Sequence, residues 1–397
     1  MVRTMLKAIP WVAVMVVLNG CPRVSPVPLP EGVVCETTAQ AGPDSSSLLE
    51  ALAQAQAGSC VVAATGTYSA SLTVPSGVSL VASPGTAVVI EGDVEARAAV
   101  TLQPRSGLFG VQIVAPPHIG VFIDRGPATV VDVKVDQAVG PALVAWCEED
   151  CRTDLLSELH DVELTRSDVG LWARGAGLKV FGGRIAQCTG SSLTSGYGVV
   201  ASHGAVLQMD SVTVEKNQGP GVIVDGAEGT DVSLHEVSVS DNQERGIWVQ
   251  GIEGSSLLPK VRLEECVLER NGLIGFGARA SRGLSIRGGR ISATEARNVP
   301  NPDFTISQVG DGIGLFAATG EVQVQDTVLE HNARSQALID SGAAGIAMPG
   351  IQVTHSTEQL GVVVQRTTEQ VQAPEVQVRP AGQELTFKDS PLALPSR

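Results

Sequence analysis

A stretch that repeats itself constrains this chain more than any other feature. Within residues 206–250 four positions, two apolar, one Asn and one Gly, return after 25 residues. The pairs are Leu207 and Val232, Val212 and Val237, Asn217 and Asn242, and Gly221 and Gly246. Apolar residues alternate with polar ones inside each copy, which is the period of a β-strand. A repeat of this length with several short strands is typical of a solenoid, so we predict one elongated all-β body with a single continuous core.

A small residue before the second alternating run of each copy marks successive coils. These markers are Gly120, Gly170, Gly198, Gly221, Gly246, Gly275, Gly314, Ala337 and Gly361. Their short intervals give the coil length, and their long intervals indicate insertions at 191–197, 252–259 and 298–310. The count predicts ten or eleven coils.

The overall charge narrows the class of partner. The chain has a formal net charge of −15, and nucleic-acid binding needs basic patches that neutralise phosphates. We therefore expect no nucleic-acid partner. The 44 glycines and 3% aromatic residues suit short strands that stack closely.

The first twenty residues have the pattern of an export signal. Arg3 and Lys7 precede an apolar run at 9–18 that is too short to span a bilayer comfortably. The run ends in Leu18, Asn19, Gly20 and Cys21, which resembles the lipobox of bacterial lipoproteins. The resemblance implies cleavage before Cys21, acylation of its thiol and, because Pro22 follows, an outer-membrane address in the cell envelope. The alternative is an ordinary secretory signal.

The rest of the chain divides by composition. Residues 21–34 are Pro-rich and predict a semi-rigid tether, 35–365 hold the coils, and 366–397 form a tail or cap. Residues 44–57 predict a short helix that covers the open end of the core. Ser47 and Glu50 have capping-box spacing, and Leu48, Leu49 and Leu52 would share a face.

Six cysteines remain once Cys21 is assigned to lipid. Cys35 and Cys60 flank the predicted helix and could form a disulfide, as could Cys147 and Cys151. A metal site is the alternative for the second pair, although no further Cys or His pair with ligand spacing accompanies it. Cys188 and Cys266 lie at repeat positions, where a buried thiol acts as a small apolar group.

The coil sequences resemble a known family. DSVTVEKNQGPGVIV, HEVSVSDNQERGIWV, EECVLERNGLIGFGA and DTVLEHNARSQALID are similar to the repeats of right-handed parallel β-helix proteins of the pectate-lyase-like group. The resemblance covers residues 48–365 and implies that fold without specifying a function. It also implies a ladder of stacked side-chain amides at one turn, formed here by Asn217, Asn242, Asn271 and Asn332.

Outward positions of the marked strands carry the candidate site. Positions +1 and +3 after each marker are apolar and should point inward, so +2 and +4 should face water. Position +2 is nevertheless apolar, and +4 is mainly polar. We predict a groove for an extended sugar polymer, which stacks on rings and hydrogen-bonds sideways. Its residues are Trp172, Arg174, Asp225, Trp248, Gln250, Arg279 and Phe316.

Two alternatives stay open for this stripe. An insertion or the tail 366–397 could pack over it, which would make it interior. The strand phase could also differ by one residue, which would place the aromatic side chains in the core.

Catalytic signatures are sparse. A lyase would use Arg174 or Arg279 as proton abstractor and Asp225 to help hold calcium, but calcium lyases bring several acids together, and the stripe has one. The carboxylate pair of a glycoside hydrolase is missing as well. The six histidines have no short ligand spacing, so no metal site or other cofactor is predicted. We expect a monomeric, lipid-anchored, non-catalytic surface protein that binds polysaccharide or serves as a structural or adhesive rod; the alternative is a polysaccharide lyase or related enzyme acting on an acidic glycan.

Overall fold

The computed structural model describes most of the chain after its first 32 residues. It covers residues 33–366 except 84, 149–154, 191–195, 227–228, 252–256, 282, 301–305, 318–320, 341–345 and 357–358, and adds the strands at 377–379 and 386–387. The predicted signal, lipidation site and tether up to residue 32 lie outside these residues. No helix in the described part is long and apolar enough to cross a membrane.

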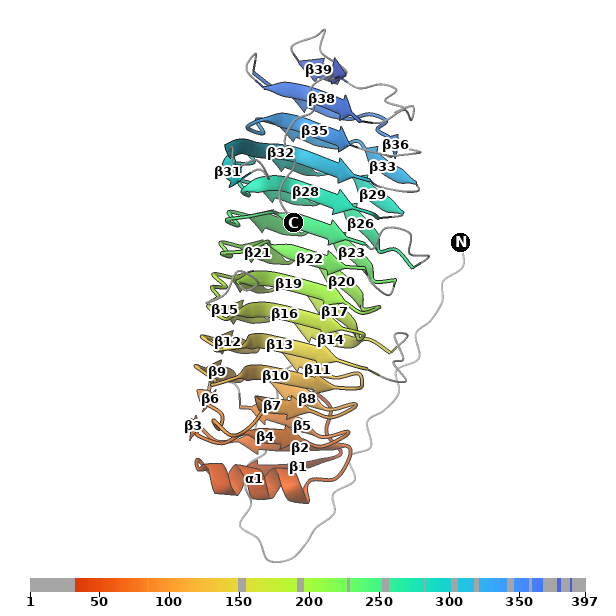
Figure 1. Cartoon of the computed structure of the whole chain (residues 1–397). Helices are drawn as coiled ribbons and strands as arrows, with labels where there is room; N and C mark the ends of the chain where they lie inside the picture. The colour runs from red at the N-terminus through yellow and green to blue at the C-terminus, as the bar shows by residue number, and fades with distance from the viewer. Residues whose placement is uncertain are drawn as a thin grey trace, which may run out of the picture.

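The chain winds into a right-handed parallel β-solenoid of about 12 turns, slightly more than the ten or eleven predicted. Each complete coil adds one strand to each of three sheets, which we name A, B and C (Figure 1). The strands of sheet A are β1 (Thr37–Ala41), β2 (Ser59–Ala63), β5 (Ser79–Ala82), β8 (Gly107–Phe109), β11 (Thr129–Val131), β14 (Ser157–His160), β17 (Gly177–Phe181), β20 (Val206–Asp210), β23 (Asp231–His235), β26 (Lys260–Glu264), β29 (Leu284–Arg287), β33 (Val322–Gln325) and β36 (Ile346–Ala347).

Sheet B consists of short strands. They are β3 (Gly66–Tyr68), β6 (Val88–Ile90), β9 (Gln112–Val114), β12 (Lys134–Asp136), β15 (Glu163–Thr165), β18 (Arg184–Ala186), β21 (Thr213–Glu215), β24 (Ser238–Ser240), β27 (Val267–Glu269), β30 (Arg290–Ser292), β34 (Val328–Glu330), β37 (Gln352–Thr354) and β39 (Gln377–Arg379).

Sheet C carries the outward face that matters for the site. Its strands are β4 (Leu72–Val74), β7 (Ala98–Leu102), β10 (Ile119–Asp124), β13 (Pro141–Trp146), β16 (Val169–Arg174), β19 (Tyr197–Ser202), β22 (Val222–Asp225), β25 (Ile247–Gln250), β28 (Leu273–Arg279), β32 (Ile306–Phe316), β35 (Ser335–Asp340), β38 (Leu360–Gln365) and β40 (Thr386–Phe387). Strand β31 (Arg297–Pro300) pairs antiparallel with β32 and forms a hairpin at one of the predicted insertions.

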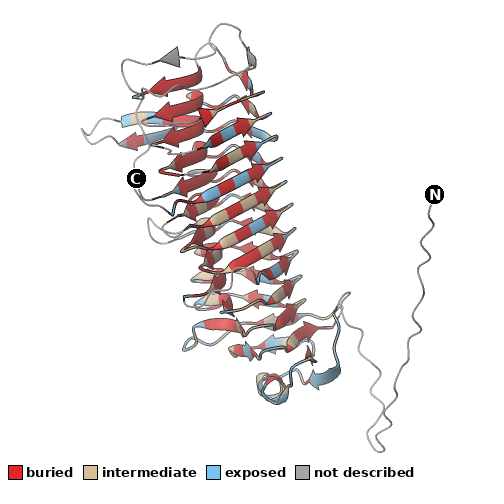
Figure 2. Ribbon diagram, turned by 90° about the vertical axis from the view of Figure 1, so that its right-hand side faces the viewer, coloured by how far each residue is buried: buried red, intermediate tan, exposed pale blue. Residues whose placement is uncertain are grey.

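The core is a column of aliphatic side chains inside the three sheets. Successive coils place like residues in register, as with Leu143, Leu171 and Val199, all fully buried. Buried and exposed positions alternate along the strands, as Figure 2 shows. Because each coil packs only on its neighbours, the sequence repeat and the spatial repeat coincide.

The one helix of the described residues, α1 (Ser45–Gln54), covers the N-terminal end of this core. Leu48 and Leu52 are buried beneath it, whereas Leu49 is 41% exposed and does not share their face as predicted. The predicted capping box is also wrong. Asp44 is the N-cap and accepts a hydrogen bond from the Ser47 amide, while the Ser47 hydroxyl accepts one from the Gly42 amide.

The cysteines divide into bonded and free residues. A disulfide joins Cys35 to Cys60 and so ties the segment before β1 to β2. Cys147 is also disulfide-bonded, and Cys151 lies outside the described residues. Cys188 and Cys266 are free and buried, and burial raises the pKa of the Cys188 thiol to about 12.

Asparagines form a ladder inside one turn of the solenoid. The amide nitrogen of Asn217 donates to Asn242 at 2.8 Å, and that of Asn242 donates to Asn271 at 2.9 Å. On the next coil Thr294 occupies the corresponding turn, and its backbone amide donates to Asn332 at 3.1 Å. All four asparagines are buried, so these bonds satisfy polar groups that water does not reach.

Candidate functional site

Two outward rows run along sheet C, one residue per coil. We call the first the apolar row; it contains Phe122, Val144, Trp172, Val200, Ile223, Trp248, Gly277, Gly314, Leu338 and Val363. The second, the polar row, contains Asp124, Trp146, Arg174, Ser202, Asp225, Gln250, Arg279, Phe316, Asp340 and Gln365. Strands β16 and β25 have the predicted phase, because their intervening residues are fully buried, whereas in β35 the marker slot is occupied by Gln336 and not by the predicted Ala337.

The position predicted for Phe316 is wrong. Phe316 pairs with Arg279 and therefore lies in the polar row, not in the row of Trp172 and Trp248. The cause is the sequence Gly312-Ile313-Gly314, in which the first glycine, not the second, occupies the marker slot. Gly314 is the apolar-row residue, and its lack of a side chain leaves room for the Phe316 ring, which would lie 2.7 Å from an added Cβ.

The C-terminal half of the apolar row is covered. Trp248 and Phe316 are 8% and 5% exposed, and their ring centroids lie 6.1 Å apart. They pack in one apolar cluster with Leu338 and Val363 and with Val299 and Val309 of the β31–β32 hairpin. An insertion thus covers this half, so it is not the open groove predicted. Gln250 remains exposed and Arg279 half-buried at its edge.

The N-terminal half of the same face holds a different arrangement, which we call the Trp–Arg cluster: Arg97, Phe122, Trp146, Trp172 and Arg174. Trp146 and Trp172 meet edge to face, with centroids 6.0 Å apart. Arg97 lies over Phe122 at 4.0 Å, and Arg174 lies over Trp146 at 4.4 Å. Both Trp rings are half-buried and Arg97 is exposed, so aromatic and guanidinium surface is presented to solvent together.

Register explains how the cluster forms. Trp146 and Arg174 are neighbours in the polar row, and Trp172 is adjacent to Val144 in the apolar row. The Trp172 indole donates to the Ser202 hydroxyl of the next coil at 3.2 Å. Cation–π contact and this hydrogen bond hold two rings and one guanidinium in fixed relative positions. Sequence reasoning missed Arg97, Phe122 and Trp146, although Gly120 marks Phe122 as a +2 residue.

The residues named for a lyase are not brought together. Arg174, Ser202, Asp225, Gln250 and Arg279 follow one another on successive coils. Asp225 is therefore two coils, about 10 Å, from either arginine. Within the described part of the chain, the one group of three potential metal-ligating side chains that converge is Asp210, His235 and Glu236, away from this face. This side of sheet C offers rings and cations, and the two acids of the polar row in its N-terminal half, Asp124 and Asp225, lie four coils apart.

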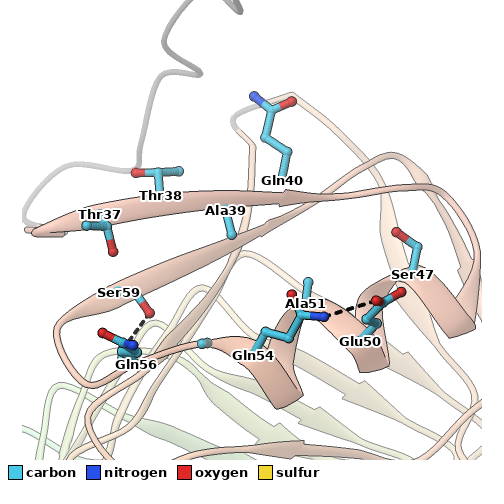
Figure 3. Close-up of a pocket in the computed structure, with 11 residues that line it drawn as sticks. Thr37, Thr38, Ala39, Gln40, Ser47, Glu50, Ala51, Gln54, Gln56 and Ser59 are labelled. Carbon is cyan, nitrogen blue, oxygen red and sulfur yellow. Dashed lines mark hydrogen bonds between the residues drawn. The ribbon is translucent and has the colours of Figure 1, made fainter. Parts of the chain in front are cut away.

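A polar cavity lies at the N-terminal end (Figure 3). It has a volume of about 450 Å³ and opens between β1 and α1. Its lining includes Thr37, Thr38, Gln40 and Gln54, and the carboxylate of Glu50 accepts a hydrogen bond from Gln54 at 3.0 Å. Hydroxyl and amide groups suit a small polar ligand, but the cavity contains neither an aromatic platform nor a catalytic pair.

Comparison with known proteins supports the architecture. Residues 169–365 match the family model of the right handed beta helix region. The A-module of the mannuronan C-5 epimerase AlgE4 of Azotobacter vinelandii superposes with a TM-score of 0.57 at 14% identity, covering 89% of this chain and 96% of that one. The catalytic unit of a thermostable alpha-1,3-glucanase of Streptomyces thermodiastaticus gives 0.50 at 15% identity, covering 92% and 69%. No curated protein matches in sequence. At these identities the likeness concerns the fold.

Proposed function

From the premise that this chain is a right-handed parallel β-helix protein, we propose that it is a non-catalytic envelope protein that binds polysaccharide through the Trp–Arg cluster. The observation that carries the proposal is the pairing of Trp146 and Trp172 beside Arg97 and Arg174 on the outer face of sheet C. Two similar folds belong to a mannuronan epimerase and an alpha-1,3-glucanase, which act on polysaccharides.

Chemistry favours a sugar polymer at this surface. Pyranose rings present flat C–H faces that stack on indole, and hydroxyl or carboxylate substituents accept hydrogen bonds from guanidinium groups. The solenoid axis offers further polar side chains on successive coils beyond the cluster, including the half-buried Asp225 and the exposed Gln250. An extended chain lying along the axis would meet a new coil about every 4.8 Å.

Binding without catalysis is the better interpretation of this face. β-Elimination needs a base beside a neutralised carboxylate, and hydrolysis needs two acids at a defined separation. Asp124 and Asp225 are the acids of the polar row in the N-terminal half of the face; two coils separate each of them from Arg174, and four coils separate them from one another. A lyase or related enzyme stays the alternative proposal, because one structural neighbour is an epimerase.

Substitution of one tryptophan tests the binding proposal. Trp172→Ala should weaken binding to a polysaccharide identified on a glycan array by about 1–2 kcal/mol, roughly five- to thirtyfold. Arg174→Ala should have a similar effect. Lys179→Ala on β17 of sheet A removes the same charge away from the cluster and is the matched control.

Three outcomes decide between the proposals. Loss of binding in the cluster variants alone, with circular dichroism unchanged, supports the site. Equal binding by Trp172→Ala and wild type would rule the cluster out. Unsaturated uronate products, seen by their ultraviolet absorbance, would replace the binding proposal with the lyase.

The envelope location is a separate proposal that rests on the sequence around Cys21. We propose that its thiol is acylated and that residues 21–34 tether a monomeric rod to the outer membrane, because several acyl chains anchor stably. Expression in a bacterium with labelled fatty acid should label the wild-type chain and leave Cys21→Ser unlabelled. Equal labelling of both would contradict lipidation at this residue.

A further inference from the structure

Three side chains able to ligate a metal converge at the corner where sheet A leads into sheet B. Asp210 ends β20, His235 ends β23, and the two residues are neighbours in the parallel register. Glu236 follows His235 directly. One ligand atom from each of the three lies within 4.8 Å of the others. Residues 25 positions apart, which is the coil repeat itself, thus come into contact.

The distance between the ligand atoms of Asp210 and His235 is that between neighbouring ligands of a metal ion. His235 Nδ1 lies 3.3 Å from Asp210 Oδ2. A tetrahedral zinc ion with bonds of about 2.0–2.2 Å holds neighbouring ligand atoms about 3.3–3.6 Å apart. The first two ligands therefore need little movement, and the exposed carboxylate of Glu236 can complete the set by side-chain rotation.

Backbone geometry fixes these positions. Ser211 and Glu236 both take left-handed conformations, with φ of 56° and 50°, so the two corners turn in the same way. The Ser211 amide donates to the His235 carbonyl at 3.0 Å, and the Glu236 amide donates to the Glu264 carbonyl at 2.9 Å. Stacked corners of a solenoid cannot move apart without breaking these bonds, so the ligand positions are preorganised.

A second, independent observation is the surplus of negative charge at this corner, where the nearest cationic residue in the parallel register is Arg287, beside Glu264. Other acids between coils have arginine partners, namely Arg166 with Asp136, Arg262 with Asp231, and Arg270 with Asp241. Glu264 and Glu265 add two carboxylates on the following coil. Within the described residues, Asp210, Glu236, Glu264 and Glu265 have no Lys or Arg nitrogen within 4.0 Å of their carboxylates. Electrostatically the corner favours a cation.

We infer that Asp210, His235 and Glu236 bind one divalent transition-metal ion of the zinc type, with the fourth position open to water. An imidazole among the ligands favours zinc, cobalt or nickel, since calcium and magnesium prefer oxygen ligands alone. Asp210 and His235 are 45% and 44% exposed at their side chains, so the ion can enter from solvent. The site joins two adjacent coils and is independent of the proposed polysaccharide binding.

Calorimetric titration of the untagged, chelator-stripped chain with zinc chloride tests the inference. We expect one zinc ion per chain and, with cobalt chloride, the visible absorption bands of a tetrahedral complex. Asp210→Asn and His235→Gln should each weaken zinc binding by roughly tenfold or more, because each removes a ligand. His160→Gln is the matched control, since His160 ends β14 at the equivalent position and lies 3.7 Å from Glu158, and no third ligand joins them among the described residues.

Opposite results would overturn the site. These are the absence of zinc binding by the wild-type chain, equal zinc affinity in His235→Gln and wild type, or an equal loss in the His160→Gln control. If calcium chloride bound as tightly as zinc chloride, the ligands would be carboxylates alone, and the assignment of His235 as a ligand would be wrong. Circular dichroism of each variant establishes that the solenoid is intact.

Discussion

Single buried amides connect the coils, and Asn242 is the central one. Its side chain accepts from Asn217 and donates to Asn271. Asn242→Ala removes both partners and leaves polar groups of two neighbouring coils unsatisfied where water does not reach. We expect the free energy of unfolding to fall by about 3 kcal/mol, measured by urea denaturation. Gln208→Ala, at an exposed position of β20, should change it by less than about 0.5 kcal/mol. Similar losses in both variants would contradict a special role for the ladder.

Charge pairs on the surface give a pH dependence of defined sign. The side-chain hydrogen bond from Arg270 holds the pKa of Asp241 below its ordinary value of 3.8. Because the folded-state pKa is depressed, the pair stabilises the fold above the ordinary pKa and loses that contribution as the pH falls through the folded value. Asp241→Asn should therefore lower the free energy of unfolding at pH 7 by about 1 kcal/mol or less. The difference from wild type should vanish near pH 2 in urea titrations; a difference that persists there would exclude the ion pair as its cause.

Among the elements, β32 carries a buried ion pair two residues beyond the part that pairs with β31. Arg334 donates to Asp311 through Nε at 2.8 Å, and the Ser335 hydroxyl donates to the same carboxylate at 2.6 Å. The side chain of Asp311 is fully buried and that of Arg334 is 13% exposed. Asp311→Ala should cost about 3–5 kcal/mol, because it removes the buried carboxylate to which both Arg334 and Ser335 donate.

Thermal unfolding and dye binding together check this prediction. A lower melting temperature with increased binding of a hydrophobic dye would indicate that the cover over Trp248 has opened. Arg262→Ala, which breaks an exposed pair with Asp231 on sheet A, is the control and should change neither quantity appreciably. A wild-type melting temperature in Asp311→Ala would contradict the argument.

Elements whose residues repeat were predictable, and those outside the repeat were not. The period of 25 residues and the alternation of Val and Leu predicted the parallel strands, because each coil repeats the same burial. Phe316 was misplaced because two glycines compete for one slot, and only the pairing of β28 with β32 decides between them. The hairpin that covers Trp248 has no counterpart in the described parts of the other coils, so no repeat could indicate where it packs. The pair Asp210 and His235 could have been predicted only by searching the sequence for possible metal ligands that lie one coil length, 25 residues, apart.

At the scale of the whole molecule, the solenoid divides one continuous sheet face into two parts. Phe122, Val144 and the two Trp rings form one apolar cluster near the N-terminal end, and the hairpin residues form another with Trp248 and Phe316. Side chains of the same outward row thus face solvent where no insertion covers them, and they are buried where the insertion packs over them. Local sequence cannot distinguish the exposed from the buried part of the row, because both parts contain aromatic and aliphatic residues.

The charge of the whole molecule opposes the charge of its proposed binding face, and this gives a last prediction. The net charge of −15 repels an acidic polysaccharide at long range, whereas Arg97 and Arg174 attract it at contact. The screening length falls from about 30 Å at 0.01 M salt to about 10 Å at 0.1 M, so salt weakens the distant repulsion more than the close attraction. Association with an acidic polysaccharide should therefore become severalfold faster over this range in surface plasmon resonance, while association with a neutral one should not change. A rate that falls with salt would mean that the local cationic field of the cluster already dominates at a distance, and Arg174→Gln should then abolish the fall.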